Sequence, residues 1–202
     1  SHFAVSHRGR EVGEVRWPLL GRHNVMNGLA ALAAVHAAGV EPAKVMPALA
    51  RFRSVKRRME FIGEVGGVNV YDDFAHHPTA IETTLAGLRS KVGDARIAVA
   101  MEPRSNSMRL GAHADALAPS LAQADSVVFL HRPELQWDAT KVVEGLRGEG
   151  LTAPDVDGLL VALRQRVFRG DHVVFMSNGG FDGAPRRFLA LLREQGVLPA
   201  GG

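Results

Sequence analysis

Two acids and two histidines stand close together in residues 72–77, directly after an apolar run and directly before a proline. Residues 68–71 are typical of a strand, and Pro78 suits the first turn of a helix because proline lacks a backbone donor and fixes a helical φ. The ionisable groups therefore stand at the carboxyl end of a strand, where open α/β sheets bind ligands. They are Asp72, Asp73, His76 and His77.

The same residues also have a purely local interpretation, with the two acids in a turn and residues 76–79 capping the next helix. A cap needs only one such side chain, so four ionisable groups favour a site. A metal site is disfavoured, because adjacent histidines on an extended segment point to opposite faces and neither cysteine nor an HExxH-type spacing is present. Since strand neighbours alternate, we expect Asp73 to face the site and Asp72 to point away.

Two further polar loops follow predicted strands. Residues 102–109 follow the apolar run 96–101, and residues 177–183 follow the run 171–176. The carboxyl ends of parallel strands share one edge of a sheet, so we expect all three polar segments on that edge. Gly179 and Gly180 precede a helix and either offer bare backbone donors to an anion or satisfy a left-handed turn.

Composition limits the functional classes. Hydrophobic residues make up 46% of the 202 residues and charged residues 22%, which predicts a globular protein of one large domain, or one domain and a fragment. The 24 basic and 21 acidic side chains, with few aromatics, disfavour nucleic-acid binding. The absence of cysteine excludes a disulfide framework and a thiol nucleophile. No apolar run reaches membrane-spanning length and no signal peptide is recognisable, so we expect a cytoplasmic protein without membrane contact.

Hydrophobic patterning predicts a strand pair in residues 1–20, then a buried helix over 27–38 capped by Asn24 and ended by Gly39, and a second helix from Pro42. The charged segment 52–60 is the expected domain boundary, with a solvated linker as the alternative. Beyond it, strands and helices alternate, and Gly66-Gly67 fits a hairpin turn. Strands are expected at 61–65, 68–71, 96–101, 126–130, near 151 and at 171–176, and helices at 79–90, 108–122, 138–148, 156–168 and 184–194.

Apolar strands separated by helices predict an α/β fold: a mostly parallel sheet with helices on both faces. Neither a GxxxxGK[ST] phosphate loop nor a complete GxGxxG is present. The phosphates of a nucleotide would therefore have no cradle of this kind within the chain.

Three strings resemble the Mur ligase family, which builds the peptide stem of bacterial peptidoglycan, in the family's order and spacing: GRHNVMNGLAA at 21–31, FRSVKRRME at 52–60 and DDFAHHPT at 72–79. The resemblance covers essentially the whole chain. It implies that residues 1–55 are the C-terminal, helical part of the central ATP-binding domain, and residues 56–202 the Rossmann-like C-terminal domain. The family's UDP-binding domain, phosphate loop, magnesium-binding positions and modified lysine find no counterpart, so we expect no ligation by this stretch alone.

Within the family, three features resemble the members that recycle peptidoglycan: Phe74 where the muramate–alanine ligases usually have Tyr, EPRSNSMRLG at 102–111, and SNGGF at 177–181. Those members join UDP-N-acetylmuramate to the tripeptide L-alanyl-γ-D-glutamyl-meso-diaminopimelate. The resemblance implies an acyl-phosphate reaction that uses ATP and Mg²⁺, with the Mg²⁺ ligands mostly outside this chain. The alternatives are a UDP-N-acetylmuramate–L-alanine ligase, a nucleotide-binding Rossmann-like domain without catalysis, and a scaffold module.

The resemblance also implies roles for residues around the nucleotide. His23, Asn24 and Asn27 would line the adenine, although on composition alone His23 and Asn24 are more typical of a helix cap. Arg58 would reach a phosphate or the ribose, for which a planar guanidinium is suited. Asp73 would bind the nucleotide and His76 would lie near the reacting groups and the amine.

The tripeptide carries carboxylates and a free amine, which the loop after residues 96–101 is suited to bind. Arg104 and Arg109 are the expected carboxylate clamps, and Ser105, Asn106 and Asn178 the expected contacts for peptide groups. The alternative for both arginines is simple surface solvation.

Overall fold

The structure is a computed structural model that describes residues 1–196 of the chain. The chain forms two compact units, Ser1–Val55 and a second that begins at Lys56. The division between them falls within the charged segment expected to be a boundary. Each unit is described by itself.

Unit 1 is built from an antiparallel hairpin and two helices: β1 (His2–His7), β2 (Arg10–Arg16), α1 (Arg22–Ala37) and α2 (Pro42–Ala50). The strand pair and the start of the second helix at Pro42 confirm the sequence prediction. Its core is small and consists of Val5, Val15, Trp17, Leu32 and Met46.

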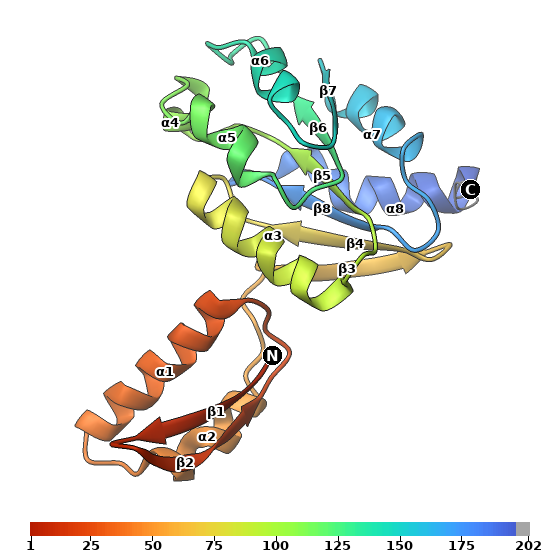
Figure 1. The fold of residues 1–202 in the computed structure, drawn as a ribbon. Coiled ribbons are helices and arrows are strands. Elements are labelled where there is room, and N and C mark those ends of the chain that lie inside the picture. The colour runs from red at the N-terminus through yellow and green to blue at the C-terminus, as the bar shows by residue number, and fades with distance from the viewer. Residues whose placement is uncertain (197–202) are drawn as a thin grey trace. The chain divides into compact units, whose positions relative to one another are not determined.

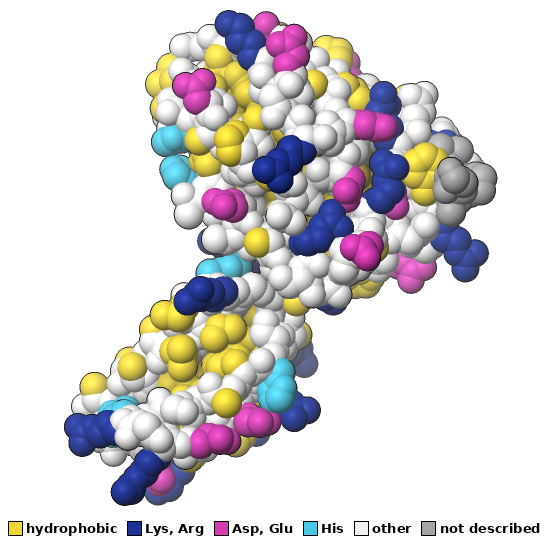
Figure 2. Space-filling model, in the orientation of Figure 1, with side chains coloured by type: hydrophobic (Ala, Val, Ile, Leu, Met, Phe, Trp, Pro, Cys, Tyr) yellow, Lys and Arg dark blue, Asp and Glu magenta, His cyan; other side chains and the backbone are white. Residues whose placement is uncertain are grey.

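Helix α1 differs from the prediction. It begins at Arg22 rather than Asn27, and its N-cap is Gly21 with φ 83°. Asn24 therefore lies inside the first turn and does not cap; its Nδ2 donates to the carbonyl of Leu20 at 2.7 Å. Only Gly28 and Leu32 of the helix are buried, and Figure 2 shows hydrophobic side chains at the surface over it. The expected burial was wrong because alanine content indicates helix propensity, not a covered face.

The second unit contains a six-stranded sheet in the order β3-β4-β8-β5-β6-β7, in which all neighbours are parallel except β3 and β4. This confirms the predicted mostly parallel α/β sheet. Gly66 and Gly67, with φ 60° and 85°, form the expected hairpin turn. The strands are β3 (Glu60–Val65), β4 (Val68–Asp73), β5 (Ile97–Met101), β6 (Ser126–Leu130), β7 (Glu149–Ala153) and β8 (His172–Met176).

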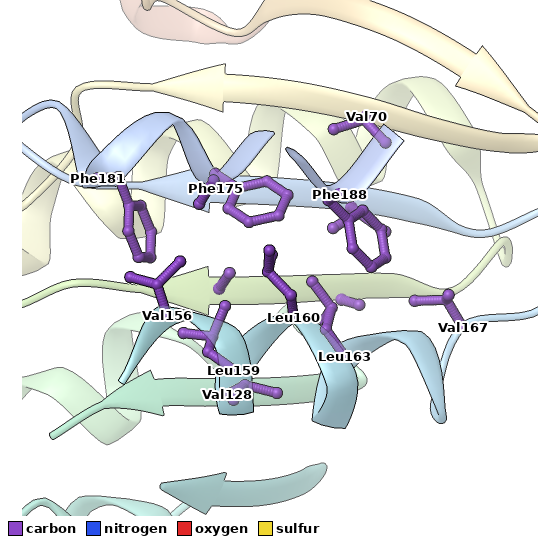
Figure 3. Packing of buried hydrophobic residues seen from close by; sticks show 14 of the residues in the cluster. Val70, Val128, Val156, Leu159, Leu160, Leu163, Val167, Phe175, Phe181 and Phe188 are labelled. Atoms are coloured by element: carbon purple, nitrogen blue, oxygen red, sulfur yellow. The ribbon is translucent and has the colours of Figure 1, made fainter. Parts of the chain in front are cut away.

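Helices cover both faces of the sheet, as Figure 1 shows. On one face lie α7 (Val156–Arg164) and α8 (Ala184–Gln195), and on the other α3 (Pro78–Val92), α5 (Ala114–Ser120) and α6 (Ala139–Glu144). Figure 3 shows the first interface, where the Phe175 ring lies 5.7 Å from those of Phe181 and Phe188. No helix within residues 1–196 is long and apolar enough to cross a bilayer.

Several expected helices are shorter. The helix predicted over 108–122 is two helices, α4 (Asn106–Arg109) and α5, because Gly111 has φ 78° and breaks the chain direction. A Cβ at Gly111 would lie 3.0 Å from the Trp137 ring. Helices α6 and α7 end at Glu144 and Arg164, four residues earlier than expected. After α6, Gly148 packs against the carbonyl of Asp125, an approach that leaves no space for a side chain.

Candidate functional site

The polar strand ends meet at one edge of the sheet. Strand β8 lies between β4 and β5, and its last residue, Met176, is in register with Asp73 on one side and Met101 on the other. The segments that follow, which begin at residues 74, 102 and 177, therefore leave the sheet side by side. This confirms that the three polar segments share one edge.

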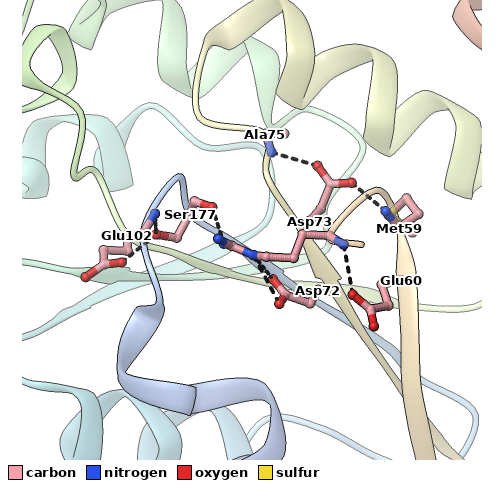
Figure 4. A network of polar contacts seen from close by, with 9 residues as sticks. Met59, Glu60, Asp72, Asp73, Ala75, Glu102 and Ser177 are labelled. Atoms are coloured by element: carbon pink, nitrogen blue, oxygen red, sulfur yellow. Dashed lines mark hydrogen bonds and ion pairs between the residues drawn. The ribbon is translucent and has the colours of Figure 1, made fainter. Parts of the chain in front are cut away.

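Asp73 is only 3% exposed and binds two backbone amides (Figure 4). Its Oδ1 accepts from the N–H of Ala75, and its Oδ2 from the N–H of Met59, both at 2.7 Å. Met59 has φ 48°, a conformation that costs a non-glycine residue energy. Asp73 therefore holds the segment before β3 against the loop after β4.

Asp72 points to the other side of the strand, as expected, and pairs with Arg57 at 3.2 Å. Burial raises the pKa of the Asp72 carboxyl, and the Arg57 guanidinium partly offsets this. Arg57 also donates to the carbonyl of Ser177, so one side chain links the start of the unit to strands β4 and β8.

Phe74 stacks with two arginines that have different environments. The Cζ atoms of Arg57 and Arg58 lie 5.3 and 5.6 Å from the centre of its ring. Arg57 is partly buried and hydrogen-bonded, whereas Arg58 is exposed and makes no hydrogen bond or ion pair within residues 1–196. The donors of Arg58 are therefore available to an anion while its guanidinium is held by the ring.

The two histidines of the central segment are in different environments. His76 Nδ1 lies 2.9 Å from the carbonyl of Phe74, and because a carbonyl only accepts, Nδ1 carries a proton; in the neutral imidazole Nε2 is then the acceptor. His77 is the N-cap of α3 and accepts from the N–H of Thr79 at 3.4 Å. The local interpretation is thus right for His77. Among the described residues, no three His, Asp or Glu side chains gather in a way that would hold a metal ion.

A cavity of about 230 Å³ opens beside the ends of β5 and β6. Arg132 in its wall is already paired, with Asp182 at 2.6 Å and with Glu102 at 3.3 Å. Arg104 makes no hydrogen bond or ion pair to any described residue, and Arg109 donates only to Asn106 at 3.3 Å. The lining residues are Glu102, Pro103, Arg104, Arg109, Leu130, Arg132, Glu134, Leu135 and Asp182.

Glu102 anchors this cavity to the central strands. It is 3% exposed, accepts from Ser177 Oγ, and binds Arg132 through its other oxygen. Ser177 Oγ in turn accepts from the N–H of Gly179 at 2.9 Å. The loops after β8, β5 and β6 are thereby joined by one chain of hydrogen bonds, part of which is drawn in Figure 4.

The other residues expected to contact the peptide lie around the same loops. Ser105 is the N-cap of α4 and accepts from the N–H of Met108 at 3.3 Å. Asn106 contacts Arg109, as described above. Asn178 Oδ1 is buried and finds no hydrogen-bond partner within residues 1–196. Buried polar atoms are normally paired, so Asn178 Oδ1 could accept a hydrogen bond from a ligand; Nε of Arg132, in the cavity wall, is likewise buried without a partner within residues 1–196.

The expectation that Gly179 and Gly180 both offer bare donors is wrong for Gly179, whose N–H is bonded to Ser177 Oγ. Nor does either glycine serve a left-handed turn, since neither has a positive φ. The left-handed residues come directly after them, at Phe181, Asp182 and Gly183.

In unit 1, the three residues expected at the adenine stand together in the first turns of α1. Asn24 Nδ2 lies 3.0 Å from His23 Nε2, and Asn27 Nδ2 lies 3.5 Å from Asn24 Oδ1. Because an amide NH₂ only donates, His23 Nε2 is the acceptor in this pair. His23 and Asn27 are exposed.

The sequence patterns did not predict roles for Arg57, Arg132 and Asp182. The signal for Arg132 was present: it follows the strand 126–130, so it stands at a fourth strand end on the same edge. Arg57 had no local signal, because its partners lie 15 and 120 residues away.

Comparisons with known proteins agree with this architecture. Residues 57–179 match the family model described as "Mur ligase, glutamate ligase domain". The chain is 47% identical over 190 residues to the UDP-N-acetylmuramate–L-alanyl-γ-D-glutamyl-meso-2,6-diaminoheptandioate ligase of Escherichia coli K12, covering 94% of this chain and 42% of that protein. The crystal structure of a murein peptide ligase from Psychrobacter arcticus 273-4 superposes with a TM-score of 0.72 at 38% identity, covering 98% of this chain and 43% of that one.

A second crystal structure is that of a domain from Haemophilus ducreyi, described as belonging to a putative UDP-N-acetylmuramate:L-alanyl-γ-D-glutamyl-diaminopimelate ligase. It is 41% identical, with a TM-score of 0.58, and the match covers 67% of this chain and 99% of that one. An α/β sheet with polar loops at the carboxyl ends of its strands, matched by this family model, defines the class: the chain belongs to the Mur ligase family. The chain spans less than half of the length of the Escherichia coli and Psychrobacter arcticus proteins.

Proposed function

We propose that this chain is part of an ATP-dependent ligase that joins UDP-N-acetylmuramate to L-alanyl-γ-D-glutamyl-meso-diaminopimelate in peptidoglycan recycling in the cytoplasm. Residues 1–55 would be the end of the central ATP-binding domain, and residues 56–202 the C-terminal domain. The observation that carries the proposal is the cavity beside β5 and β6, where Arg104 and Arg109 have guanidinium donors to spare.

The peptide side of this site fits a ligand with several carboxylates. A guanidinium binds a carboxylate through two parallel hydrogen bonds, and Arg104 and Arg109 are both exposed at the cavity. Asn178 Oδ1, buried without a partner, would accept a peptide N–H. Ser105 and Asn106, already ordered by α4, would supply further contacts to the peptide.

Each unit, taken by itself, carries side chains suited to contacts with a nucleotide. Arg58 is exposed, has no polar partner among the described residues and is stacked on Phe74, which suits it to bind a phosphate or a ribose. His23, Asn24 and Asn27 form a connected polar group suited to the edge of adenine. Asp73 would add a contact to the nucleotide beyond the two amides it binds. ATP is consumed with Mg²⁺, to which we assign no ligand within residues 1–196.

In the reaction, ATP would transfer its γ-phosphoryl group to the muramate carboxylate and leave as ADP. The amine of the tripeptide would then attack the carbonyl carbon of this acyl phosphate, so that the new C–N bond replaces the C–O bond to phosphate and inorganic phosphate leaves. The amine attacks only when it has lost its proton. His76 presents Nε2 as an acceptor because Nδ1 is bonded to Phe74, so this side chain is placed to receive the proton. Asp73 keeps the loop that carries His76 in place.

The test is a ligation assay on the longer protein that contains this chain, with ATP, Mg²⁺, UDP-N-acetylmuramate and the tripeptide. Mass spectrometry should detect the joined product, and phosphate release should require both substrates. Free L-alanine is the comparison substrate. A product formed with L-alanine in preference to the tripeptide would identify an alanine ligase. If neither amine gives a product, the alternatives that remain are a nucleotide-binding domain without catalysis and a scaffold module.

A further inference from the structure

The side chain of Arg104 lies across the α-carbon of Gly179. A Cβ built on Gly179 would lie 2.3 Å from Arg104 Cδ, 2.6 Å from Nη1 and 2.7 Å from Nε. These distances are far below van der Waals contact, so any side chain at position 179 would occupy space that the Arg104 side chain now fills. Since Gly179 does not have a positive φ, the backbone itself does not require glycine there.

Gly179 is itself held in a fixed place. Its N–H donates to Ser177 Oγ, and Ser177 donates to the buried Glu102, one residue from Pro103 and two from Arg104. The two loops are therefore joined by hydrogen bonds on one side and by the Arg104–Gly179 contact on the other. Arg104 makes no hydrogen bond or ion pair within residues 1–196, so packing on Gly179, together with the nearby charge of Asp182, can direct its guanidinium.

We propose that Gly179 is a positioning residue: its missing side chain gives Arg104 the place from which the guanidinium reaches a carboxylate of the peptide at the cavity. This inference rests on the proposed function. It means that Gly179, in the loop after β8, contributes to the choice of peptide made by Arg104, in the loop after β5. The neighbouring Gly180 offers a matched control, because a Cβ there would meet nothing within 4 Å and its φ is −72°.

The kinetic test uses four variants of the longer protein: Gly179→Ala, Gly180→Ala, Arg104→Ala and Arg104→Ala/Gly179→Ala. Loss of a charge-assisted contact weakens binding by roughly ten- to a hundredfold, so Arg104→Ala should raise the tripeptide KM by that factor. Gly179→Ala should raise the tripeptide KM by about fivefold or more, as a partial loss of the same contact, and leave the KM for ATP unchanged. Gly180→Ala should resemble the wild type.

The double variant decides whether the two residues act together. If Gly179 works through Arg104, adding Gly179→Ala to Arg104→Ala should change nothing further. Additive losses, or equal losses from Gly179→Ala and Gly180→Ala, would overturn the proposal. If Gly179→Ala lowers the melting temperature, the double variant should recover it, because the clashing Arg104 side chain is gone; a loss that persists in the double variant would also overturn it.

A second readout, on the 202-residue chain itself, does not depend on the reaction. The Nε–Hε signal of Arg104, identified by its loss in Arg104→Ala, should move in the NMR spectrum of Gly179→Ala and stay in place in Gly180→Ala. An unmoved signal in Gly179→Ala would refute the positioning contact whatever the protein catalyses. A longer protein that never ligates the tripeptide would refute the proposed function, and the NMR comparison would still decide the contact.

Discussion

Asp73 shows how one side chain serves both the fold and the site. Its two oxygens bind the amides of Met59 and Ala75, and so hold a left-handed residue and the loop that carries His76. Asp73 was expected at the site because it stands at a strand end, but these bonds could not be predicted, because one of them crosses 14 residues to the backbone of Met59, an apolar residue in the charged segment 52–60.

We expect Asp73→Ala to lower the free energy of unfolding by about 2–4 kcal/mol, since two amides lose a charged acceptor. It should also reduce ligation by the longer protein far more than Asp72→Ala does. Denaturant unfolding and turnover, measured on both variants, test this. Equal losses of turnover in the two variants, with both folded, would mean that the strand end is oriented differently from the structure described.

The two arginines that stack on Phe74 are expected to have different roles, Arg57 in stability and Arg58 in nucleotide binding. Arg57→Ala leaves Asp72 and the carbonyl of Ser177 without a partner and should destabilise the chain by about 1–3 kcal/mol. Arg58→Ala removes an exposed side chain with no polar partner among the described residues, so stability should change by less than about 0.5 kcal/mol while the KM for ATP rises. Thermal unfolding and nucleotide kinetics distinguish the pair. A stability loss in Arg58→Ala as large as that in Arg57→Ala would contradict this assignment.

The burial of Asp171 predicts that the stability of the chain depends on pH. It is 4% exposed, accepts from the N–H of Phe168 at 3.0 Å, and burial raises the pKa of its carboxyl. The folded state then holds the proton more tightly than the unfolded chain. The free energy of unfolding should therefore fall as pH rises from the ordinary pKa of an aspartate to the raised pKa of Asp171. Asp171→Asn keeps the acceptor without the charge, and should melt about 1–3 °C higher at pH 7, with the difference vanishing near pH 3. An equal difference at both pH values would contradict this.

At the scale of elements, strands were predicted better than helices. The inner strands β5, β6 and β8 are short, mainly apolar runs, and their burial on both faces makes such runs easy to recognise in the sequence. Helix ends depend on contacts distant in sequence, such as that of Gly111 with Trp137, so a continuous pattern over 108–122 concealed a break. Arg109, the last residue of α4 before this break, lines the cavity.

Gly111 can be compared with Gly93, since both have a positive φ but only Gly111 faces a side chain. Gly93→Ala should cost about 1 kcal/mol from backbone strain alone. Gly111→Ala should cost more, about 2–3 kcal/mol, because the new methyl group also meets the ring of Trp137. Thermal melts of the two variants measure the difference. Equal costs would mean that Trp137 moves aside freely and does not fix the break.

At the scale of the whole molecule, the two units differ in how much core they have. The second unit buries a continuous cluster between its sheet and α7 and α8, whereas unit 1 has five buried apolar side chains. The sequence predicted the boundary from its charges, but the exposure of α1 depends on what surrounds it, which no local pattern records.

Expressed separately, residues 56–202 should therefore unfold in one cooperative transition, and residues 1–55 should show weak or no cooperativity, since so small a core is marginal. Circular dichroism during heating measures both. A sharp transition for residues 1–55, with none for residues 56–202, would reverse the assignment of the stable core.

The position of β8 has a consequence for how the protein is made. Strand β8 pairs with β4 and β5 at the middle of the sheet, yet it leaves the ribosome last of the six strands; Tyr71 of β4 and His172 of β8, whose side chains contact each other, are 101 residues apart. Until it emerges, β4 and β5 lack their shared neighbour and expose unpaired edges, which favour aggregation. A chain cut short before Met176 would thus lack the centre of its sheet, not its margin, and premature termination late in synthesis should be as damaging as termination early.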